Sequence, residues 1–325
     1  MSRAAAATTP SLVTQDQIRA AAVRIAPYVS ATPIVPLVRG GPGLKAENLH
    51  PVGAFKLRGA FNALLSLGAD ALARGVIAYS SGNHAQAVAY AAHVLGARAV
   101  VVMPDNAPAA KLAATRGWGA EVVVVGPASA ERAARARVLA AAQGLTIIPP
   151  FDAAEIIAGT GTIGLEILMD RPDVALVAVP VSGGGLISGV AAALKLSNPD
   201  IRVVGVEPEL ADDAAQSFHA GRLTAITGEA ASRTIADGLR VQELGALNWR
   251  HVQAYVDDIV TVSEEAIKDA VRRIATGARL VAEPSGATAL AGLLSLRDAA
   301  PDRSIAILSG GNVDIAAYAE ILRGS

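Results

Sequence analysis

Residues 47–62 read ENLHPVGAFKLRGAFN and place a single lysine, Lys56, among small and apolar residues. Apolar residues follow it at helical spacing, and a glycine stands where the helix is expected to end: Leu57, Phe61, Leu64, Leu65 and Gly68. An ammonium in the first turn meets the positive end of the helix dipole and loses hydration when buried, so both effects lower its pKa. Most lysines are solvated surface residues. A neutral amine can form a Schiff base with a carbonyl, so Lys56 is the first candidate for catalysis.

Short β-branched runs alternate with alanine-rich stretches that are typical of helices. One series of expected strands covers residues 76–79, 99–103, 121–125 and 145–148, and a second covers 176–181, 203–206, 259–262 and 305–308. This alternation predicts an α/β fold with two domains, each holding a mostly parallel sheet flanked by helices. The active site is then expected in the cleft between the two domains.

The composition limits the class of function. The chain has 325 residues, of which 52% are hydrophobic and 18% charged, with a formal net charge of −1. Scattered charges give no footprint for nucleic acid, and prolines and glycines interrupt the long uncharged run 174–194, so we expect no membrane span and a small-molecule substrate. The chain has no cysteine, which excludes disulfides and a thiol nucleophile. The expected setting is cytoplasmic.

Two further segments carry candidate binding groups. Ser80–His84 (SSGNH) follows an expected strand and precedes an expected helix, whose first N–H groups can hold a carboxylate; ordinary helix capping explains the same residues equally well. The run SGGGL at 182–186 joins a buried strand to a helix, where bare backbone amides can wrap a phosphate, although a tight bend is the alternative. A lysine suited to imine formation together with a phosphate loop suggests pyridoxal 5′-phosphate.

With these motifs the chain resembles the fold type II pyridoxal phosphate enzymes, whose fold is that of the tryptophan synthase β subunit, and within them the threonine dehydratase and serine racemase group. The matching segments run almost from end to end: Glu47–Asn48, Gly53–Ala60, Ser80–Gln86, Gly161–Glu166, Ser182–Leu186, Glu207–Pro208, Ala282–Ala287 and Ser309–Asn312. The resemblance implies a discontinuous large cofactor-binding domain, residues 1–67 and 152–325, and a small substrate-binding domain, residues 68–151. It also implies a homodimer.

The resemblance assigns roles to single residues. Lys56 would bond to the cofactor and remove the α-proton, with Phe55 packing beside the ring, Asn83 bonding its 3′ oxygen and Ser309 bonding its pyridine nitrogen. The phosphate would lie on Gly183, Gly184, Gly185 and Leu186. Gly238 and Glu283 would lie near the ring, and Ser80, Ser81, Gly82, Asn83 and His84 would bind the substrate.

The implied reaction is β-elimination from a β-hydroxy amino acid, by default L-threonine or L-serine, to a 2-keto acid and ammonia. 3-Hydroxyaspartate, phenylserine or an ectoine-derived compound are alternative substrates. A serine at position 81 matches the racemases, where it is the acid or base on the opposite face of the cofactor, so amino acid racemisation is the rival hypothesis. Substituting Ser81→Ala should then abolish isomerisation and spare elimination.

The acidic segment EPELADD, Glu207–Asp213, raises the question of a metal. Taken alone it reads as a solvated loop, yet two carboxylates and a carbonyl also make a hard oxygen site for Mg²⁺ or Ca²⁺. In serine-racemase-like relatives the matching ligands would be Glu207, Asp213 and the carbonyl of Ala211. The resemblance therefore implies a second site, for a metal ion, beside the cofactor site.

Overall fold

A computed structural model describes residues 11–80, 82–107, 109–126 and 128–324 of the chain. Its strands are β1 Ile34–Pro36, β2 Gly43–Ala46, β3 Val76–Tyr79, β4 Ala99–Pro104, β5 Glu121–Val125, β6 Thr146–Ile147, β7 Leu176–Pro180, β8 Arg202–Pro208, β9 Asp258–Val262 and β10 Ser304–Leu308. Its α-helices are α1 Gln15–Ile25, α2 Lys56–Leu65, α3 Ala69–Arg74, α4 Asn83–Val94, α5 Ala109–Gly117, α6 Ser129–Gln143, α7 Ala154–Asp170, α8 Gly185–Lys195, α9 Asp213–Ala220, α10 Gly228–Ser232, α11 Ala246–Tyr255, α12 Glu264–Arg273, α13 Pro284–Ser295 and α14 Ile315–Arg323. Single-turn elements are η1 Glu47–Leu49, η2 Asp237–Leu239, η3 Ile274–Ala278 and η4 Pro301–Arg303.

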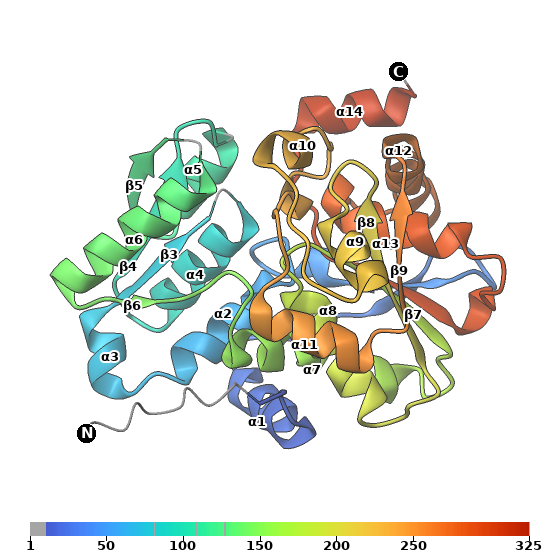
Figure 1. The fold of residues 1–325 in the computed structure, drawn as a ribbon, viewed down its shortest axis with the longest axis horizontal. Coiled ribbons are helices and arrows are strands. Elements are labelled where there is room, and N and C mark those ends of the chain that lie inside the picture. Colours follow the sequence, from blue (N-terminus) through green and yellow to red (C-terminus); the bar gives the residue numbers. More distant parts are fainter. Residues whose placement is uncertain (1–10, 81, 108, 127, 325) are drawn as a thin grey trace.

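The strands form two separate sheets, which lie on the left and right of Figure 1. The four-stranded sheet has the order β5-β4-β3-β6 and is parallel throughout. The six-stranded sheet has the order β1-β2-β10-β7-β8-β9, with only β1 antiparallel to its neighbour. The predicted α/β fold with mostly parallel sheets is confirmed, and every predicted strand is found to within two residues at each end.

The edge strands β1 and β2 were not predicted. Each has three or four residues beside prolines and glycines, so neither shows a β-branched run long enough to stand out. Their register nevertheless positions the site, because Ala46 at the end of β2 pairs with Leu308 at the end of β10. The segments that follow these two strands therefore leave the sheet side by side, at the carboxyl edge where open α/β sheets bind ligands.

Helix α2 begins at Lys56, as predicted, and ends at Leu65, three residues before the expected Gly68. It lies between the two sheets (Figure 1) and packs against α4 on one side and α7 on the other. Helices α7 and α8 approach closely because Gly189 has no side chain: a Cβ there would lie 2.3 Å from the carbonyl oxygen of Ile157.

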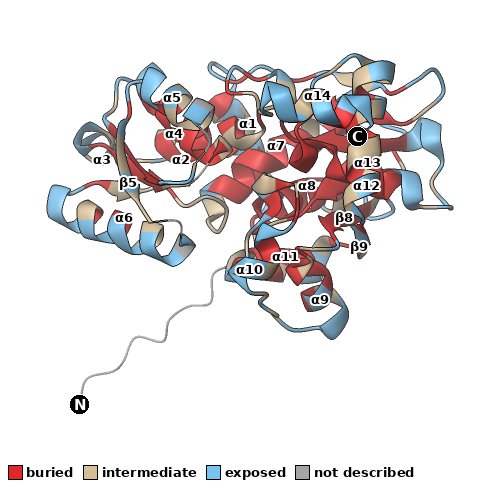
Figure 2. Cartoon of the chain, turned by 90° about the horizontal axis from the view of Figure 1, so that it is seen from above, coloured by how far each residue is buried: buried red, intermediate tan, exposed pale blue. Residues whose placement is uncertain are grey.

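The interior is mainly apolar, and one cluster of buried hydrophobic residues joins both parts through α2 and α4. Figure 2 shows α7, α8 and α13 almost wholly buried, whereas α6 and α14 present exposed faces. Helices buried on all sides in this way are apolar all round, which explains why their sequences carry so few charges. Within the described ranges, no helix is both long and apolar enough to cross a membrane.

Candidate active site

Lys56 stands at the start of α2 with its amine directed to the small-sheet part. Its Nζ donates to the carbonyl oxygen of Pro150 at 2.7 Å and lies 5.0 Å from the centre of the Phe55 ring. Desolvation lowers the pKa of the Lys56 amine to about 8. The predicted shift toward the neutral, nucleophilic amine is therefore present, and its cause is burial.

The loop before Lys56 is fixed to the segment that follows β10. The Phe55 amide donates to the carbonyl of Ser309 at 3.0 Å, and the Gly311 amide donates to the carbonyl of Gly53 at 2.9 Å. Gly53 has φ +68°, and a Cβ on it would lie 2.4 Å from Oδ1 of Asn312. A glycine is therefore required where the Lys56 loop meets the Ser309 segment.

Three side chains join α4 to the large-sheet part. Nδ2 of Asn83 donates to Oε1 of Glu283 at 2.6 Å, and Nδ2 of Asn312 donates to Oδ1 of Asn83 at 2.9 Å. Glu283 is 2% exposed, and burial raises the pKa of its carboxyl to about 7, with Lys111 opposing this shift and Asp237 adding to it. The carboxyl packs on Gly310, where a Cβ would lie 2.2 Å from Oε1, so it borders Ser309.

The predicted carboxylate-binding segment is placed at the start of α4, with Ser80 just after β3. The Gly82 amide donates to Oγ of Ser80 at 3.2 Å. His84 contacts the carbonyl oxygen of Ile148 through Nε2 at 3.0 Å, and burial together with the charge of Lys56 lowers the pKa of His84 to about 3, so it is neutral. Ser81, the predicted second catalytic residue, lies outside the described residues.

The glycine loop occupies the predicted position between β7 and α8. Gly184 has φ +93°, and a Cβ on it would lie 2.8 Å from Cβ of Asn248, while a Cβ on Gly183 would lie 2.5 Å from the Phe151 ring. Leu186 is buried in the first turn of α8. The Pro150 carbonyl accepts a hydrogen bond from the Lys56 amine, and the neighbouring Phe151 packs against the glycine loop. Consecutive residues therefore contact the lysine and the loop.

The residues present fit pyridoxal phosphate. Among the described residues the hydroxyl of Ser182 is buried without a hydrogen-bond partner, at the mouth of a loop whose side-chain-free amides begin α8. First-turn amides have no partner inside their own helix and favour an anion. An anion cup next to a lysine with a lowered pKa is the donor set that a phosphorylated aldehyde needs. The predicted tight bend and the predicted phosphate site are thus the same loop.

The acidic segment is not a solvated loop. Glu207 is the penultimate residue of β8, Asp213 begins α9, and both carboxyls and Ala211 are buried. Oε1 of Glu207 and both carboxylate oxygens of Asp213 have no partner among the described residues. Burial, and for Glu207 also the charge of Asp213, raises the pKa of both carboxyls, that of Asp213 to about 7. The described part of the chain gathers no three His, Asp or Glu side chains at one point, so a cation here would need backbone oxygen as well.

Lys111 and Asp237 also border the site, and sequence reasoning missed the lysine. Nζ of Lys111, on α5, lies 2.5 Å from Oδ2 of Asp237 in η2. Gly238, expected near the cofactor, donates its amide to Oγ of Ser285 at 2.8 Å. The segment around Lys111 carries no recognised motif. The one signal in the sequence is a single lysine within an alanine-rich stretch.

A buried ion-pair cluster supports the first turn of α2. Arg58 is wholly buried and bonds to Glu47 through Nε at 2.7 Å and to Glu166 through Nη1 at 2.5 Å, while Lys45 bonds to Glu166 at 2.6 Å. Burial alone would raise the pKa of Glu47, but the charge and hydrogen bonds of Arg58 and His50 together outweigh it and hold that pKa well below its ordinary value. Arg58 is two positions after Lys56 in the first turn of α2, so this cluster fixes the backbone that carries the amine.

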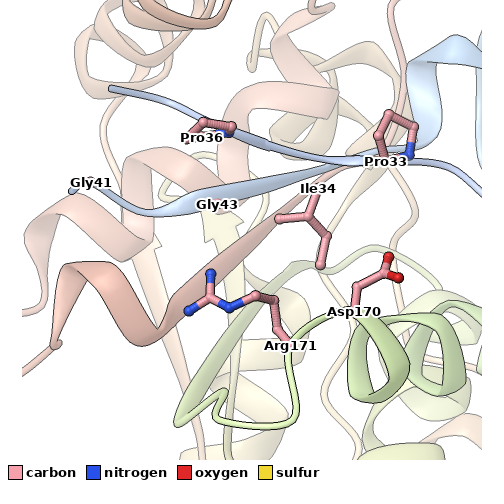
Figure 3. Close-up of a pocket in the computed structure, with 7 residues that line it drawn as sticks. All are labelled: Pro33, Ile34, Pro36, Gly41, Gly43, Asp170 and Arg171. Carbon is pink, nitrogen blue, oxygen red and sulfur yellow. The ribbon is translucent and has the colours of Figure 1, made fainter. Parts of the chain in front are cut away.

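A pocket of about 530 Å³ lies elsewhere, between β1 and the end of α7 (Figure 3). Figure 3 shows Asp170 and Arg171 below the strand that carries Ile34, and prolines and glycines complete the wall. None of the residues that line this pocket is among the residues described above around Lys56, the glycine loop and Glu283. We assign no chemistry to this pocket.

Comparisons with known proteins identify the family of this chain. Residues 25–310 match the family described as pyridoxal-phosphate dependent enzyme. The L-threonine ammonia-lyase of Thermotoga maritima is 43% identical over 84% of this chain and 67% of its own, and the L-threo-3-hydroxyaspartate ammonia-lyase of Saccharomyces cerevisiae is 39% identical over 96% and 97%. The structure of maize serine racemase superposes with a TM-score of 0.90 at 38% identity, covering 97% of this chain and 98% of that one. The chain belongs to the pyridoxal-phosphate dependent enzymes of fold type II.

Proposed function

We propose that this chain is an ammonia-lyase that converts a β-hydroxy amino acid, with L-threonine and L-serine as the first substrates to test, into a 2-keto acid and ammonia. Relatives with L-threonine and L-threo-3-hydroxyaspartate ammonia-lyase names match most of the chain and support this class. The observation that carries the proposal is the Lys56 amine, whose pKa is lowered to about 8 beside the glycine loop. An amine with that pKa can both attack a carbonyl and accept a proton near neutral pH.

The chain's own residues then have distinct tasks. Pyridoxal phosphate, when bound, supplies an electron-withdrawing ring that acidifies the substrate Cα–H. Lys56 accepts that proton at Nζ, and the neutral His84 beside it adds no competing positive charge. The first turn of α4 binds the substrate carboxylate through backbone N–H groups. Gly183, Gly184, Gly185 and Leu186 hold the phosphate, and Phe55, Asn83, Gly238, Glu283 and Ser309 surround the ring.

Ser309 would bond the pyridine nitrogen through a neutral hydroxyl. With a neutral hydroxyl as the partner of its nitrogen, the pyridine ring withdraws less electron density from the substrate than it would with a carboxylate partner. This setting suits loss of a β-hydroxyl over reactions that need a long-lived carbanion. The proposed elimination therefore agrees with the residue at this position.

Keto acid release tests the proposal. Purified protein loaded with pyridoxal phosphate is incubated with L- and D-threonine, L- and D-serine, 3-hydroxyaspartate and phenylserine, and 2-keto acid and ammonia are measured. We expect equal amounts of both products from at least one L-substrate, and a loss of about 10³-fold or more in Lys56→Ala, the upper range for one acid–base group. Keto acid formation that survives in Lys56→Ala would refute the role of Lys56, and no product from any substrate would refute the lyase.

Racemisation is the second candidate function, favoured by the close superposition on maize serine racemase. Production of D-serine from L-serine, measured by chiral chromatography beside keto acid release, separates the two reactions. If Ser81 is the acid or base on the opposite face, Ser81→Ala loses D-serine formation and keeps keto acid release. Equal loss of both products would argue against that role.

Four further expectations belong to the same proposal. Glu207, Asp213 and the Ala211 carbonyl would bind Mg²⁺ or Ca²⁺, supported by the partnerless carboxylate oxygens. The strands of the four-stranded sheet all fall within residues 68–151, which supports a small substrate domain there and a large domain from 1–67 and 152–325. A homodimer and a cytoplasmic setting stay predictions.

A further inference from the structure

Polar contacts between the small-sheet part, residues 68–151, and the rest of the chain gather beside the active site. Asn83 bonds to Glu283 and Asn312, and Lys111 pairs with Asp237. The Asn83 contacts are hydrogen bonds, whereas the Lys111–Asp237 contact joins two charged groups. It is thus an ion pair of this junction, and it links α5 to η2.

Lys111 also covers the substrate segment. A Cβ built on Gly82 would lie 3.4 Å from both Cδ and Nζ of Lys111, so the end of the lysine side chain lies directly over this glycine. Gly82 is the residue before α4, whose first-turn amides face the predicted carboxylate. The lysine therefore spans from α5, across the start of α4, to Asp237 on the large-sheet side.

The pair is sheltered enough to matter energetically. The side chain of Lys111 is 11% exposed and that of Asp237 is 37% exposed, and Nζ lies 2.5 Å from Oδ2. Ion pairs between fully solvated side chains contribute little, but partial burial reduces screening by water and salt. The backbone at Lys111 is also fixed within α5, because Thr115 Oγ1 donates to the Lys111 carbonyl oxygen at 2.8 Å.

We propose that Lys111 is a positioning residue for substrate binding: its ion pair with Asp237 holds the start of α4 against the large-sheet part, in the place where the amides meet the substrate carboxylate. The kinetic part of this inference rests on the proposed function, and the structural part does not. No sequence motif predicts this ion pair, because its two residues are 126 positions apart.

The expected kinetic signature follows from the chemistry of the carboxylate. The α-carboxylate keeps its charge throughout elimination, so amides that bind it stabilise ground state and transition state equally. Loss of such uniform binding raises KM and leaves kcat unchanged. A residue that merely supported the fold would instead lower the melting temperature and the amount of active protein.

The experiment compares Lys111→Met, Asp237→Asn, the double variant and Lys111→Arg in the full chain loaded with pyridoxal phosphate. Lys195→Met is the matched control, because Lys195 and Asp257 form a pair of 2.7 Å with side chains 15% and 36% exposed, away from the Lys56 cluster. Amide hydrogen exchange of the first turns of α4 and α5 is measured without substrate, and KM and kcat are measured with it.

We expect about tenfold faster exchange at the start of α4 in Lys111→Met and Asp237→Asn, with KM raised about tenfold and kcat within about twofold of the wild type. Lys111→Arg should restore KM to within about threefold, and the two single effects should fall short of additivity by about fivefold. Exchange and KM in Lys111→Met that match Lys195→Met, or fully additive effects, would overturn the proposal. If Lys111→Met fails to fold, Asp237→Asn and Lys111→Arg decide by the same measurements. Exchange needs no substrate, so its result stands even if the proposed lyase activity fails.

Discussion

Asn83 donates its side-chain amide to Glu283 at 2.6 Å across 200 residues of sequence, and so joins the first turn of α4 to the residue that precedes α13. Only one oxygen of the Glu283 carboxyl receives this bond. The other, Oε2, is buried and has no partner among the described residues. A proton on that oxygen removes the charge that burial disfavours, which is why the pKa of Glu283 is raised.

Glu283→Gln should therefore change how stability depends on pH. The folded-state pKa, about 7, lies above the ordinary 4.5, so the folded protein keeps this proton to higher pH than the unfolded chain does. The stability that Glu283 contributes is complete below the ordinary pKa and is lost as pH rises through 7. We expect the melting temperature of cofactor-free Glu283→Gln, relative to the wild type, to be higher at pH 8.5 than at pH 5.5 by about 3 °C or more. Circular dichroism at both pH values measures this, and the same difference at both would contradict it.

Gly184→Ala should weaken cofactor binding. The residue has φ +93°, and the new Cβ would lie 2.8 Å from both Asn248 and Leu244, so the loop must move. Gly221→Ala is the matched control, because Gly221 has φ +69° but nothing within 4 Å of a new Cβ. Both variants share the backbone cost of about 1–2 kcal/mol. In an absorbance titration we expect the Kd for pyridoxal phosphate to rise at least tenfold in Gly184→Ala alone, and equal affinities in the two variants would be evidence against the phosphate loop.

Added Ca²⁺ or Mg²⁺ should raise the melting temperature of the wild-type protein near pH 8. A cation that binds the folded state alone contributes about 2.7 kcal/mol at a concentration one hundred times its Kd. Asp213→Asn and Glu207→Gln remove ligand charge and should abolish the shift. Glu209→Gln tests the exposed acid of the same segment and should keep it. A shift that persists in Asp213→Asn would place the cation elsewhere.

Arg58→Met should destabilise the protein by about 3–5 kcal/mol, because it removes the cation that Glu47 and Glu166 share and leaves His50 beside Glu47 and Lys45 beside Glu166. Arg98→Ala, which breaks the pair with Glu121 whose side chains are 48% and 53% exposed, should cost less than about 1 kcal/mol. Urea unfolding of both variants measures the difference. Similar losses of unfolding free energy in the two variants would show that the buried cluster stabilises the protein no more than a surface ion pair does.

Local sequence patterns predicted much of the fold. The run of β-branched residues at 99–103 and the helical spacing after Lys56 each describe one element, and each appears where predicted. Strands β1 and β2 were missed because they depend on pairing, β2 with β10 and β1 with β2, more than on their own composition. The glycine loop was predicted for the same local reason as the helices, since glycine at Gly184 meets a positive φ.

By itself, the sequence determined the eight predicted strands and their alternation with helices, the lysine at the start of α2 and the glycine loop, because these depend on residues close together in the chain. The tertiary structure alone decided that Asn83 meets Glu283, that Lys111 reaches Asp237, and that Glu207 and Asp213 are buried. Those contacts join residues from different elements, and their charges and pKa values depend on burial. Burial arises only when the two sheets and their helices pack together, so no local pattern contains it.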